Sequence, residues 1–386
     1  MSAKKVFRIF HNHREALFLR RPNRFLVIAA DPETGEELPC HCPNPGSIAE
    51  FTIPGTRLIL ERRPEGGKTA WTAAAVRYDG GREVIVPLYS ARANEAAAVL
   101  LLPRLFPRAR ILLPEYAIGG SRFDFLAVDK NGDRHLIEIK ACSLVECGIA
   151  MFPDAPSARA LKHLEELAAL SLKGYKTHVI FMIMHGKPDR FVPNLHTDPA
   201  FAAALGRYAG QVNCGAYSLK ADESGLASLA DSEVPIDLGH TGLAESDSGS
   251  YMMMLQLDHQ VEIAVGGLGR LKFEPGWYIY CGSAKKGLAK RVARHQRKIG
   301  KALHWHIDYL APHALSIKGL PIYSYRNLEC DLAAALGGMG GKAIPRFGST
   351  DCGCESHLFR FDNDPMKSRT FLNMVFAFRH RKSFEP

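Results

Sequence analysis

The chain has 386 residues, of which 46% are hydrophobic and 23% are charged, and its net charge is +9 at pH 7. This composition is typical of a soluble globular protein, and because no apolar run approaches the roughly 18–20 residues that cross a bilayer, a membrane-spanning protein is excluded. The length predicts two or three domains. The nine cysteines form no evident disulfide framework and no secretory signal begins the chain, so we expect a cytoplasmic protein without a membrane partner.

The basic character is stronger than the net charge suggests. Residues 220–248 contain one lysine and seven acidic residues, a net charge of −6, and since the whole chain carries +9 the remainder carries +15. A basic body attracts polyanions, and nucleic acid is the commonest polyanion of a cytoplasm. We therefore expect a nucleic-acid partner, DNA first and RNA second; the alternative is that the charge serves solubility alone.

Residues 1–90 predict a small β-barrel. Short strand-like runs separated by Pro and Gly turns cover residues 6–10, 25–29, 57–60, 71–77 and 84–88. Barrels of this size often bind single strands through aromatic platforms and basic grooves. The aromatic candidates are Phe25, Phe51, Trp71 and Tyr78, although aromatic residues at strand positions more often belong to the core.

Residues 91–220 alternate between helical and strand-like patterns. The patterns predict helices over 91–105, 158–172 and 200–209, and strands over 123–128, 136–141, 178–184 and 214–219. These elements indicate a mixed sheet flanked by helices.

Two of these strands carry carboxylates where a buried strand normally carries Val or Ile. Glu138 and Lys140 point to the same side of a strand, whereas the isoleucines beside them enter the core. If Asp124 lies on the neighbouring strand, two carboxylates and an ammonium group meet, which suits Mg²⁺ or Mn²⁺ and a water that attacks a phosphate. This is the spacing of the PD-(D/E)xK nuclease site. The alternative is an edge strand with a surface ion pair.

The surrounding residues resemble the sugar fermentation stimulation protein family, whose members are regarded as DNA-binding proteins or nucleases. The matching pieces extend over much of the first 220 residues: Arg24-Phe25-Leu26, His41-Cys42-Pro43-Asn44-Pro45-Gly46-Ser47, Asn94, Glu115, Gly120-Ser121-Arg122-Phe123-Asp124-Phe125, Glu138-Ile139-Lys140, Phe152-Pro153-Asp154-Ala155 and Lys162-His163-Leu164. The chain departs from the family pattern at residues 141–144 and 157–161.

This resemblance implies an OB-like domain over 1–90 and a PD-(D/E)xK restriction-endonuclease-like α/β domain over 91–220. The catalytic residues would be Asp124, Glu138 and Lys140, with Glu115 as a further metal ligand. The residues expected to contact nucleic acid are Arg24, Asn44, Arg122, Arg159, Lys162 and His163; Lys162 and His163 could instead approach the site itself, or simply lie on a solvated helix face.

Residues 221–248 combine Gly, Ser, Asp and Glu with few large apolar residues, which predicts an exposed acidic linker. The domain after it, 249–386, contains Gly249-x-Tyr251, Tyr280-x-Gly282 and a basic helix over 288–298. This region resembles the GIY-YIG nuclease superfamily and implies an α+β fold. The catalytic set would be Tyr251, Tyr280, Arg291, His295 and the metal ligand Glu329, with Arg294 on the nucleic acid; the gap between the two triplets is longer than usual.

Two cysteine clusters and the C-terminal tail are further features of the sequence. Cys352-x-Cys354 with His357 has a loose metal-ligand appearance, which His304 and His306 could extend, but zinc normally needs four ligands at recognised spacing, so a structural turn is favoured. Cys40 and Cys42 are expected to pack as small buried hydrophobes. The basic tail, 366–386, predicts a terminal helix docked on its own domain.

The sequence thus favours a multidomain α+β, metal-dependent nuclease. The first alternative is a non-cleaving DNA-binding regulator of sugar-metabolism genes that retains nuclease folds. The second is a scaffold in which only the C-terminal domain is active. The oligomeric state and the strandedness of the substrate stay open.

Overall fold

The computed structural model describes residues 5–79 and 83–381, and the chain divides into two compact units, Met1–Thr241 and Gly242–Pro386. Within the described residues, no helix has the length and apolar character needed to cross a membrane.

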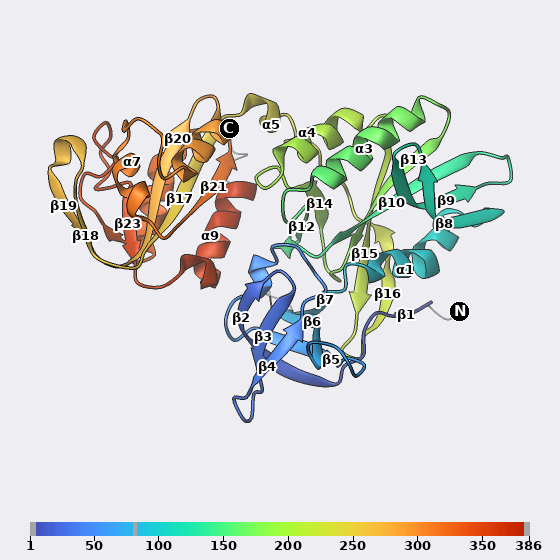
Figure 1. The fold of residues 1–386 in the computed structure, drawn as a ribbon. Helices are drawn as coiled ribbons and strands as arrows, with labels where there is room; N and C mark the ends of the chain where they lie inside the picture. Colours follow the sequence, from blue (N-terminus) through green and yellow to red (C-terminus); the bar gives the residue numbers. More distant parts are fainter. Residues whose placement is uncertain (1–4, 80–82, 382–386) are drawn as a thin grey trace. The chain divides into compact units, whose positions relative to one another are not determined.

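The first part of unit 1 is a closed barrel (Figure 1). Its strands follow the order β4-β3-β2-β5-β6. β4 also pairs with β6, Cys40 with Trp71 and His41 with Thr72, which closes the sheet on itself. The bounds are β2 (Arg14–Asn23), β3 (Leu26–Ala30), β4 (Glu37–His41), β5 (Arg57–Arg62) and β6 (Trp71–Asp79), with a 3-10 turn at Ala49–Phe51. The strands β2 and β4 were not predicted, because β2 is rich in Arg and β4 contains a proline.

The barrel core confirms part of the sequence interpretation. Cys40 and Cys42 are fully buried, as expected, and Phe51 and Tyr78 lie in the same core. Phe25, by contrast, is 50% exposed. Of the aromatic candidates for stacking on bases, Phe51 and Tyr78 are therefore core residues.

The second part of unit 1 continues the same sheet through β7 (Glu83–Pro87) in the order β7-β15-β13-β10-β9-β8. β13 is parallel to both β10 and β15, whereas β9 runs antiparallel to β10 and β8. The strands are β8 (Ile111–Ile118), β9 (Ser121–Val128), β10 (Arg134–Cys142), β13 (Lys176–Ile183) and β15 (Asn213–Ala221). A small separate sheet contains β11 (Val145–Glu146), β12 (Ile149–Phe152) and β14 (Arg190–Pro193).

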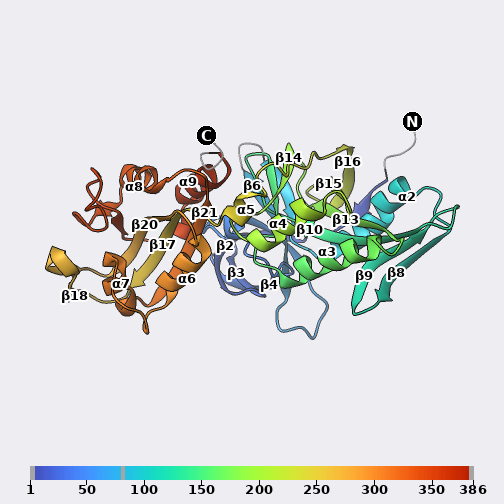
Figure 2. The same ribbon diagram turned by 90° about the horizontal axis from the view of Figure 1, so that it is seen from above.

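Helices cover both faces of this sheet (Figures 1 and 2). α3 (Ala158–Ser171) and α4 (Pro199–Tyr208) pack against one core, which includes Leu136 and Phe181. The other core includes Ile137 and Ile139 and is covered by a continuous helical segment made of α1 (Arg92–Ala96), a π-helical turn (Ala97–Leu101) and α2 (Leu102–Leu105). The alternation predicted for β10 is therefore present, with Leu136 and Ile137 on opposite faces.

The prediction of an acidic linker over residues 221–248 is partly wrong. Residues Leu226–Glu233 form β16, which pairs with β15 and, through Leu226 and Ala227, with β1 (Phe7–Arg8). Ala227 is fully buried and Val234 nearly so. The alternating small apolar residues of this segment serve a strand, although its acidic residues on the outer face give it the composition of a linker. The division between the units falls later, between Thr241 and Gly242.

Unit 2 is built on an antiparallel sheet in the order β21-β17-β20-β23-β22. The strands are β17 (Gly249–Leu257), β20 (Gly276–Ala284), β21 (Ser316–Tyr323), β22 (Lys342–Ala343) and β23 (Leu358–Phe361). Its helices are α5 (Leu243–Ser246), α6 (Leu288–Gln296), α7 (His306–Leu310), α8 (Glu329–Gly338) and α9 (Arg369–His380), and 3-10 turns cover Gly266–Leu268, Ala311–His313 and Pro365–Lys367.

Two helical layers enclose this sheet, with α6 on one face and α8 and α9 on the other (Figure 2). Met252 and Ile279 pack with Leu332 of α8 and Phe371 of α9 in one core. The tail therefore begins as the docked helix that the sequence predicts, although its last residues, 382–386, lie outside the described part. The long gap between the two triplets is explained by an inserted hairpin of β18 (Val261–Ala264) and β19 (Arg270–Phe273).

Candidate active site

The predicted carboxylates meet where β9 and β10 separate. The last backbone pair of these strands is Ile137 with Phe125, one position before Glu138 and Asp124. Beyond this pair, the Asp124 side chain replaces backbone pairing, because its Oδ2 accepts a hydrogen bond from the backbone N–H of Ile139 at 2.7 Å. Its Oδ1 accepts from Nδ2 of Asn94 in α1 at 2.6 Å. The aspartate is therefore fixed from a strand and from a helix.

Glu138 is the centre of a second set of contacts. It is 3% exposed, and its Oε1 lies 2.6 Å from Nζ of Lys140 and 2.6 Å from Nδ1 of His163. His163 is held in turn by an edge contact with Phe123, whose ring centroid lies 5.8 Å away. The helix α3 thus supplies an imidazole that fixes Glu138. The prediction that His163 contacts nucleic acid is wrong, since the ring is buried, and its place on Glu138 makes it a site residue.

The two carboxyl groups have opposite pKa shifts. Burial, followed by repulsion from Glu138, raises the pKa of Asp124 to about 6. Burial also acts to raise the pKa of Glu138, but the His163 hydrogen bond and the Lys140 charge outweigh it and lower that pKa below its ordinary value. At neutral pH both groups are ionised, and Asp124 bears the larger electrostatic penalty. The repulsion also shows that the two carboxylates are close enough to act on one another.

The oxygens of this site fit a divalent cation. Oε2 of Glu138 is buried, and within the described part of the chain it has no hydrogen-bond partner. A buried carboxylate oxygen without a partner is costly and needs an explanation such as an ion or an ordered water. Hard cations such as Mg²⁺ and Ca²⁺ bind carboxylate oxygens, and a positive charge beside Asp124 would relieve its repulsion with Glu138.

Glu115 and Arg122 stand beside the site rather than in it. The register places Glu115 of β8 opposite Asp124, between the pairs of Pro114 with Phe125 and Tyr116 with Phe123. Its exposed carboxylate, however, lies 2.8 Å from Nε of Arg122. The metal role of Glu115 and the nucleic-acid role of Arg122 stay predictions, and each would first require this ion pair to open.

Asn44 belongs to the joint between the barrel and the central sheet. It is 6% exposed, and its Nδ2 donates to Oγ of Ser143 at 3.1 Å. Its neighbour Gly46 leaves no space for a side chain, because a Cβ there would lie 1.9 Å from Oδ2 of Asp154. The prediction that Asn44 contacts nucleic acid is therefore wrong. Two sequence pieces that matched the family, around Asn44 and Asp154, form this joint.

The remaining predicted cations of unit 1 are exposed. Arg24 stacks over the ring of Phe25, with 4.7 Å between its Cζ and the ring centroid. Arg159 lies exposed near the start of α3, and Nζ of Lys162 lies 3.7 Å from Glu166. These side chains are free to move toward a phosphate, so their nucleic-acid role stays a prediction.

The second predicted set also comes together, in unit 2. Tyr251 and Tyr280 stand on adjacent strands with ring centroids 6.5 Å apart, and the Tyr251 hydroxyl lies 3.0 Å from Nε2 of His295 in α6. Tyr251 pairs in register with Gly282, where a Cβ would lie 2.4 Å from the tyrosine Cζ. The glycine of the second triplet is therefore needed so that the Tyr251 ring can pass over the neighbouring strand.

The acid and the cations of this set have partners of their own. Glu329 opens α8, and its Oε2 accepts from Oγ of Ser283 at 2.6 Å while its Oε1 lies 2.9 Å from Nδ1 of His357. The guanidinium groups of Arg291 and Arg294 both lie over Trp305, at 4.2 and 4.4 Å from the ring centroid. Arg294 also forms hydrogen bonds to buried Asp308, the shortest at 2.9 Å, while its side chain remains 20% exposed, so its contact with nucleic acid stays a prediction.

Burial controls the protonation of this second set. It raises the pKa of Tyr251 and that of Tyr280 above the ordinary tyrosine value, so both phenols are neutral at physiological pH. Burial also lowers the pKa of His295 to about 4, so its ring is neutral and its Nε2 can accept a hydrogen bond from the Tyr251 hydroxyl. Arg291 acts in the opposite direction on Tyr251, because its positive charge favours the phenolate.

Sequence comparisons place the chain in a known class of protein. Residues 19–86 match the family model described as the SfsA N-terminal OB domain, and residues 91–225 match the sugar fermentation stimulation protein RE domain. Residues 250–379 match a domain of unknown function, DUF123. The barrel of unit 1 is therefore an OB domain, and unit 2 carries a DUF123 domain.

Curated relatives cover unit 1. A sugar fermentation stimulation protein homolog from Pyrobaculum arsenaticum is 36% identical over 223 residues, which are 57% of this chain and 93% of the relative. A homolog from Methanothermobacter thermautotrophicus is 35% identical over 221 residues, 56% of this chain and 90% of the relative. The chain therefore belongs to the sugar fermentation stimulation protein family.

A solved structure resembles the same region. It is described as Pyrococcus furiosus SfsA in complex with Ca²⁺, and it aligns with a TM-score of 0.53 and 26% sequence identity over 60% of this chain and 99% of that chain. The similarity supports the arrangement of the OB domain and the α/β domain in unit 1.

Proposed function

We propose that unit 1 is a metal-dependent phosphodiesterase that cleaves nucleic acid at a PD-(D/E)xK site, with Asp124, Glu138 and Lys140 as the catalytic residues. The observation that carries this proposal is the buried, unpartnered Oε2 of Glu138 beside an aspartate whose pKa is raised. The solved relative described in complex with Ca²⁺ supports a divalent cation in this family. In this chain the cation would be Mg²⁺ or Mn²⁺, held by Asp124 and Glu138.

Each protein group has a task that its contacts define. Asn94 and the backbone N–H of Ile139 hold Asp124, and His163 holds Glu138, so the carboxylates are oriented before substrate arrives. Lys140, 2.6 Å from Glu138, can turn its ammonium group toward a phosphate oxygen or toward the attacking water. The cation, when bound, would neutralise phosphate charge and acidify a water molecule.

The test is degradation of single- and double-stranded DNA and RNA by the purified protein with Mg²⁺ or Mn²⁺. We expect Glu138→Gln and Asp124→Asn to lower the rate by about 10²–10³-fold or more. Nucleic-acid binding should persist in both, because Lys and Arg supply the phosphate contacts. Glu165→Gln, on the exposed side of α3, is the matched control and should leave the rate unchanged.

A second measurement separates the metal site from turnover. Addition of Mg²⁺ or Ca²⁺ should raise the unfolding temperature of the wild type but not that of Glu138→Gln, since a ligand stabilises only the state that binds it. Protein that binds nucleic acid and never cleaves it across this panel would instead support the regulator of sugar-metabolism genes.

Unit 2 supports a further candidate site, of the GIY-YIG type. Tyr251, Tyr280, Arg291, His295 and Glu329 would form this site, in which the Tyr251 hydroxyl is oriented by its contact with the neutral His295 and Arg291 would hold a phosphate. Glu329 would be its metal ligand, which requires its present contacts with Ser283 and His357 to rearrange. Loss of residual cleavage in Tyr251→Phe, measured in a Glu138→Gln background, tests this assignment.

A further inference from the structure

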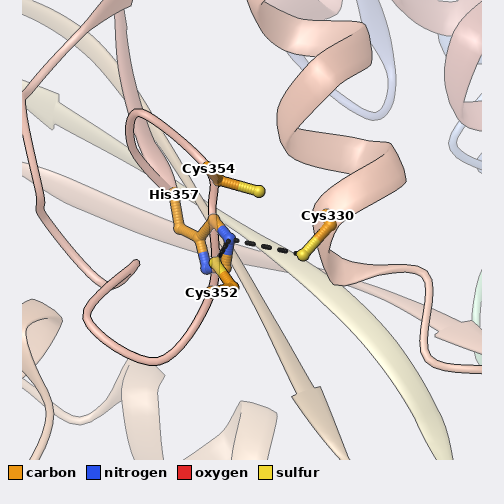
Figure 3. A group of neighbouring side chains, drawn as sticks. All are labelled: Cys330, Cys352, Cys354 and His357. Atoms are coloured by element: carbon orange, nitrogen blue, oxygen red, sulfur yellow. Dashed lines mark hydrogen bonds between the residues drawn. The ribbon is translucent and has the colours of Figure 1, made fainter.

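We propose that Cys330, Cys352, Cys354 and His357 bind one structural zinc ion in unit 2. The four potential ligand atoms, three thiol sulfurs and one imidazole nitrogen, all lie within 4.8 Å of one another. Cys330 comes from the first turn of α8, whereas the other three come from the loop that precedes β23 (Figure 3). The inference is independent of the nuclease activity proposed above.

The spacing of the atoms is close to that of a tetrahedral zinc site. Nε2 of His357 lies 3.4 Å from Sγ of Cys352 and 3.9 Å from Sγ of Cys330. With Zn–S and Zn–N bonds of about 2.3 and 2.0 Å, ligand atoms of a tetrahedral site stand roughly 3.5–3.8 Å apart. Small rotations of the cysteine side chains therefore suffice to close the coordination shell.

His357 is oriented as a zinc ligand. Its Nε2 faces the thiols, and its other nitrogen, Nδ1, lies 2.9 Å from Oε1 of Glu329, although at an angle wide of an ideal hydrogen bond. A carboxylate at this distance favours a proton on Nδ1, which leaves the Nε2 lone pair free for a metal. Ligating histidines in proteins commonly have such a carboxylate partner. The ring is 2% exposed, so the imidazole is held in this orientation by the residues around it.

The loop lacks an apolar core of its own. Residues 348–356 read Gly-Ser-Thr-Asp-Cys-Gly-Cys-Glu-Ser, so the cysteines are its least polar side chains. The loop is anchored at its base, where buried Phe347 and His357 pair through the His357 N–H at 2.8 Å. Between these anchors, coordination would hold the thiols against α8, because metal binding supplies folding free energy that a small polar segment lacks.

Four protein ligands imply a closed, structural site. Zinc in catalytic sites keeps an open position for water, whereas a Cys₃His set fills the tetrahedron. The ion would connect the first turn of α8 to the strand β23. Since Glu329 precedes Cys330 directly, the zinc also fixes the carboxylate that the second candidate site uses.

The test is the metal content of the full-length protein, purified without an affinity tag and washed with Mg²⁺. We expect one zinc per chain by mass spectrometry, and less than a tenth of that in Cys330→Ser and in Cys354→Ser. Cys147→Ser, which removes an exposed cysteine of unit 1, should retain the full amount. Zinc that stays in both cluster variants, or a wild type that carries none after refolding with zinc, would overturn the proposal.

Cobalt substitution keeps the proposal testable if the cluster variants do not fold. Co²⁺ in the wild-type protein should give the intense visible bands of a tetrahedral site and a thiolate charge-transfer band, both removed by added zinc. A weak octahedral spectrum would contradict the assignment. So would a disulfide among the three cysteines, found by peptide mass spectrometry of protein that was purified with reductant and never exposed to oxidant.

Discussion

The carboxylates of the two units differ in what their oxygens already hold. Glu138 uses one oxygen for Lys140 and His163 and leaves the other buried without a partner in the described structure, whereas Glu329 engages Ser283 with one oxygen and approaches His357 with the other. An acid with a free buried oxygen is prepared for a cation. An acid whose oxygens are both engaged first serves the local structure. The comparison therefore supports the catalytic role proposed for unit 1 over the one proposed for unit 2, since Glu329 would first have to leave its contacts with Ser283 and His357.

The largest expected effect comes from exchanging one carboxylate at a time. Glu138→Gln should abolish metal-dependent cleavage, with a loss of about 10²–10³-fold, because it removes a metal ligand while it keeps the side-chain volume. Glu329→Gln should change the same rate less than twofold. Cleavage rates under saturating Mg²⁺ measure both.

The reverse result would break the comparison. If Glu329→Gln removes cleavage and Glu138→Gln does not, the activity belongs to unit 2. Zinc content of Glu329→Gln serves as the control, since loss of zinc there would assign the defect to the coordination of His357 rather than to catalysis.

The second-largest expected effect is a pH dependence of folding stability that comes from Asp124. Its pKa is raised to about 6 in the folded protein, so between about pH 4 and pH 6 the folded state holds a proton that the unfolded state has released. Stability from this group is thus present at low pH and lost as pH rises through 6, by roughly 2–3 kcal/mol in metal-free protein. Denaturant unfolding with EDTA at pH 4.5 and pH 8 should show this loss in the wild type and not in Asp124→Asn.

Metal should reverse that dependence. A bound cation favours ionised Asp124, so the stabilisation by Mg²⁺ should grow as pH rises above 6 and vanish below 5. A wild type whose metal-free stability follows that of Asp124→Asn at both pH values would show that Asp124 carries no such penalty.

The smallest expected effect is on stability and tests whether Asn44 has a structural role. Asn44→Ala removes the buried hydrogen bond to Ser143, and we expect it to destabilise unit 1 by about 1–2 kcal/mol. Nucleic-acid affinity of the folded variant should stay within twofold. Asn131→Ala, in an exposed turn, is the matched control and should change stability by less than about 0.5 kcal/mol. A large loss of affinity without loss of stability would restore the predicted contact.

Much of the candidate site in unit 1 was predictable because it depends on local periodicity. Two-residue alternation in β10 places Glu138 and Lys140 on one side, and an Asp in the preceding strand follows from hairpin-like pairing of β9 and β10. His163 was expected to approach either the site or a phosphate, but its burial against Glu138 depends on how α3 packs. A buried position at the apolar face of α3, beside Leu164 and Leu167, was the available signal.

The contacts between distant segments could not be read from the sequence. Cys330 stands 22 residues before Cys352, so no spacing rule joins it to Cys352-x-Cys354 and His357. His304 and His306, considered as further ligands, have other contacts: Nδ1 of His306 accepts from the backbone N–H of Gly348, and His304 packs on Trp305. Neither histidine belongs to the cluster of Cys330, Cys352, Cys354 and His357. Composition also failed at β16, because an edge strand tolerates acidic residues on its exposed side.

The pairing of β1 with β16 has a consequence for how the protein is made. Phe7 pairs with Ala227, about 220 residues later in the chain, so β1 finds its partner only when almost all of unit 1 has been synthesised. The first residue of unit 2 follows shortly afterwards, at Gly242. Vectorial synthesis can therefore finish one folding unit before the next is exposed, which lowers the chance that strands of the two sheets pair with each other.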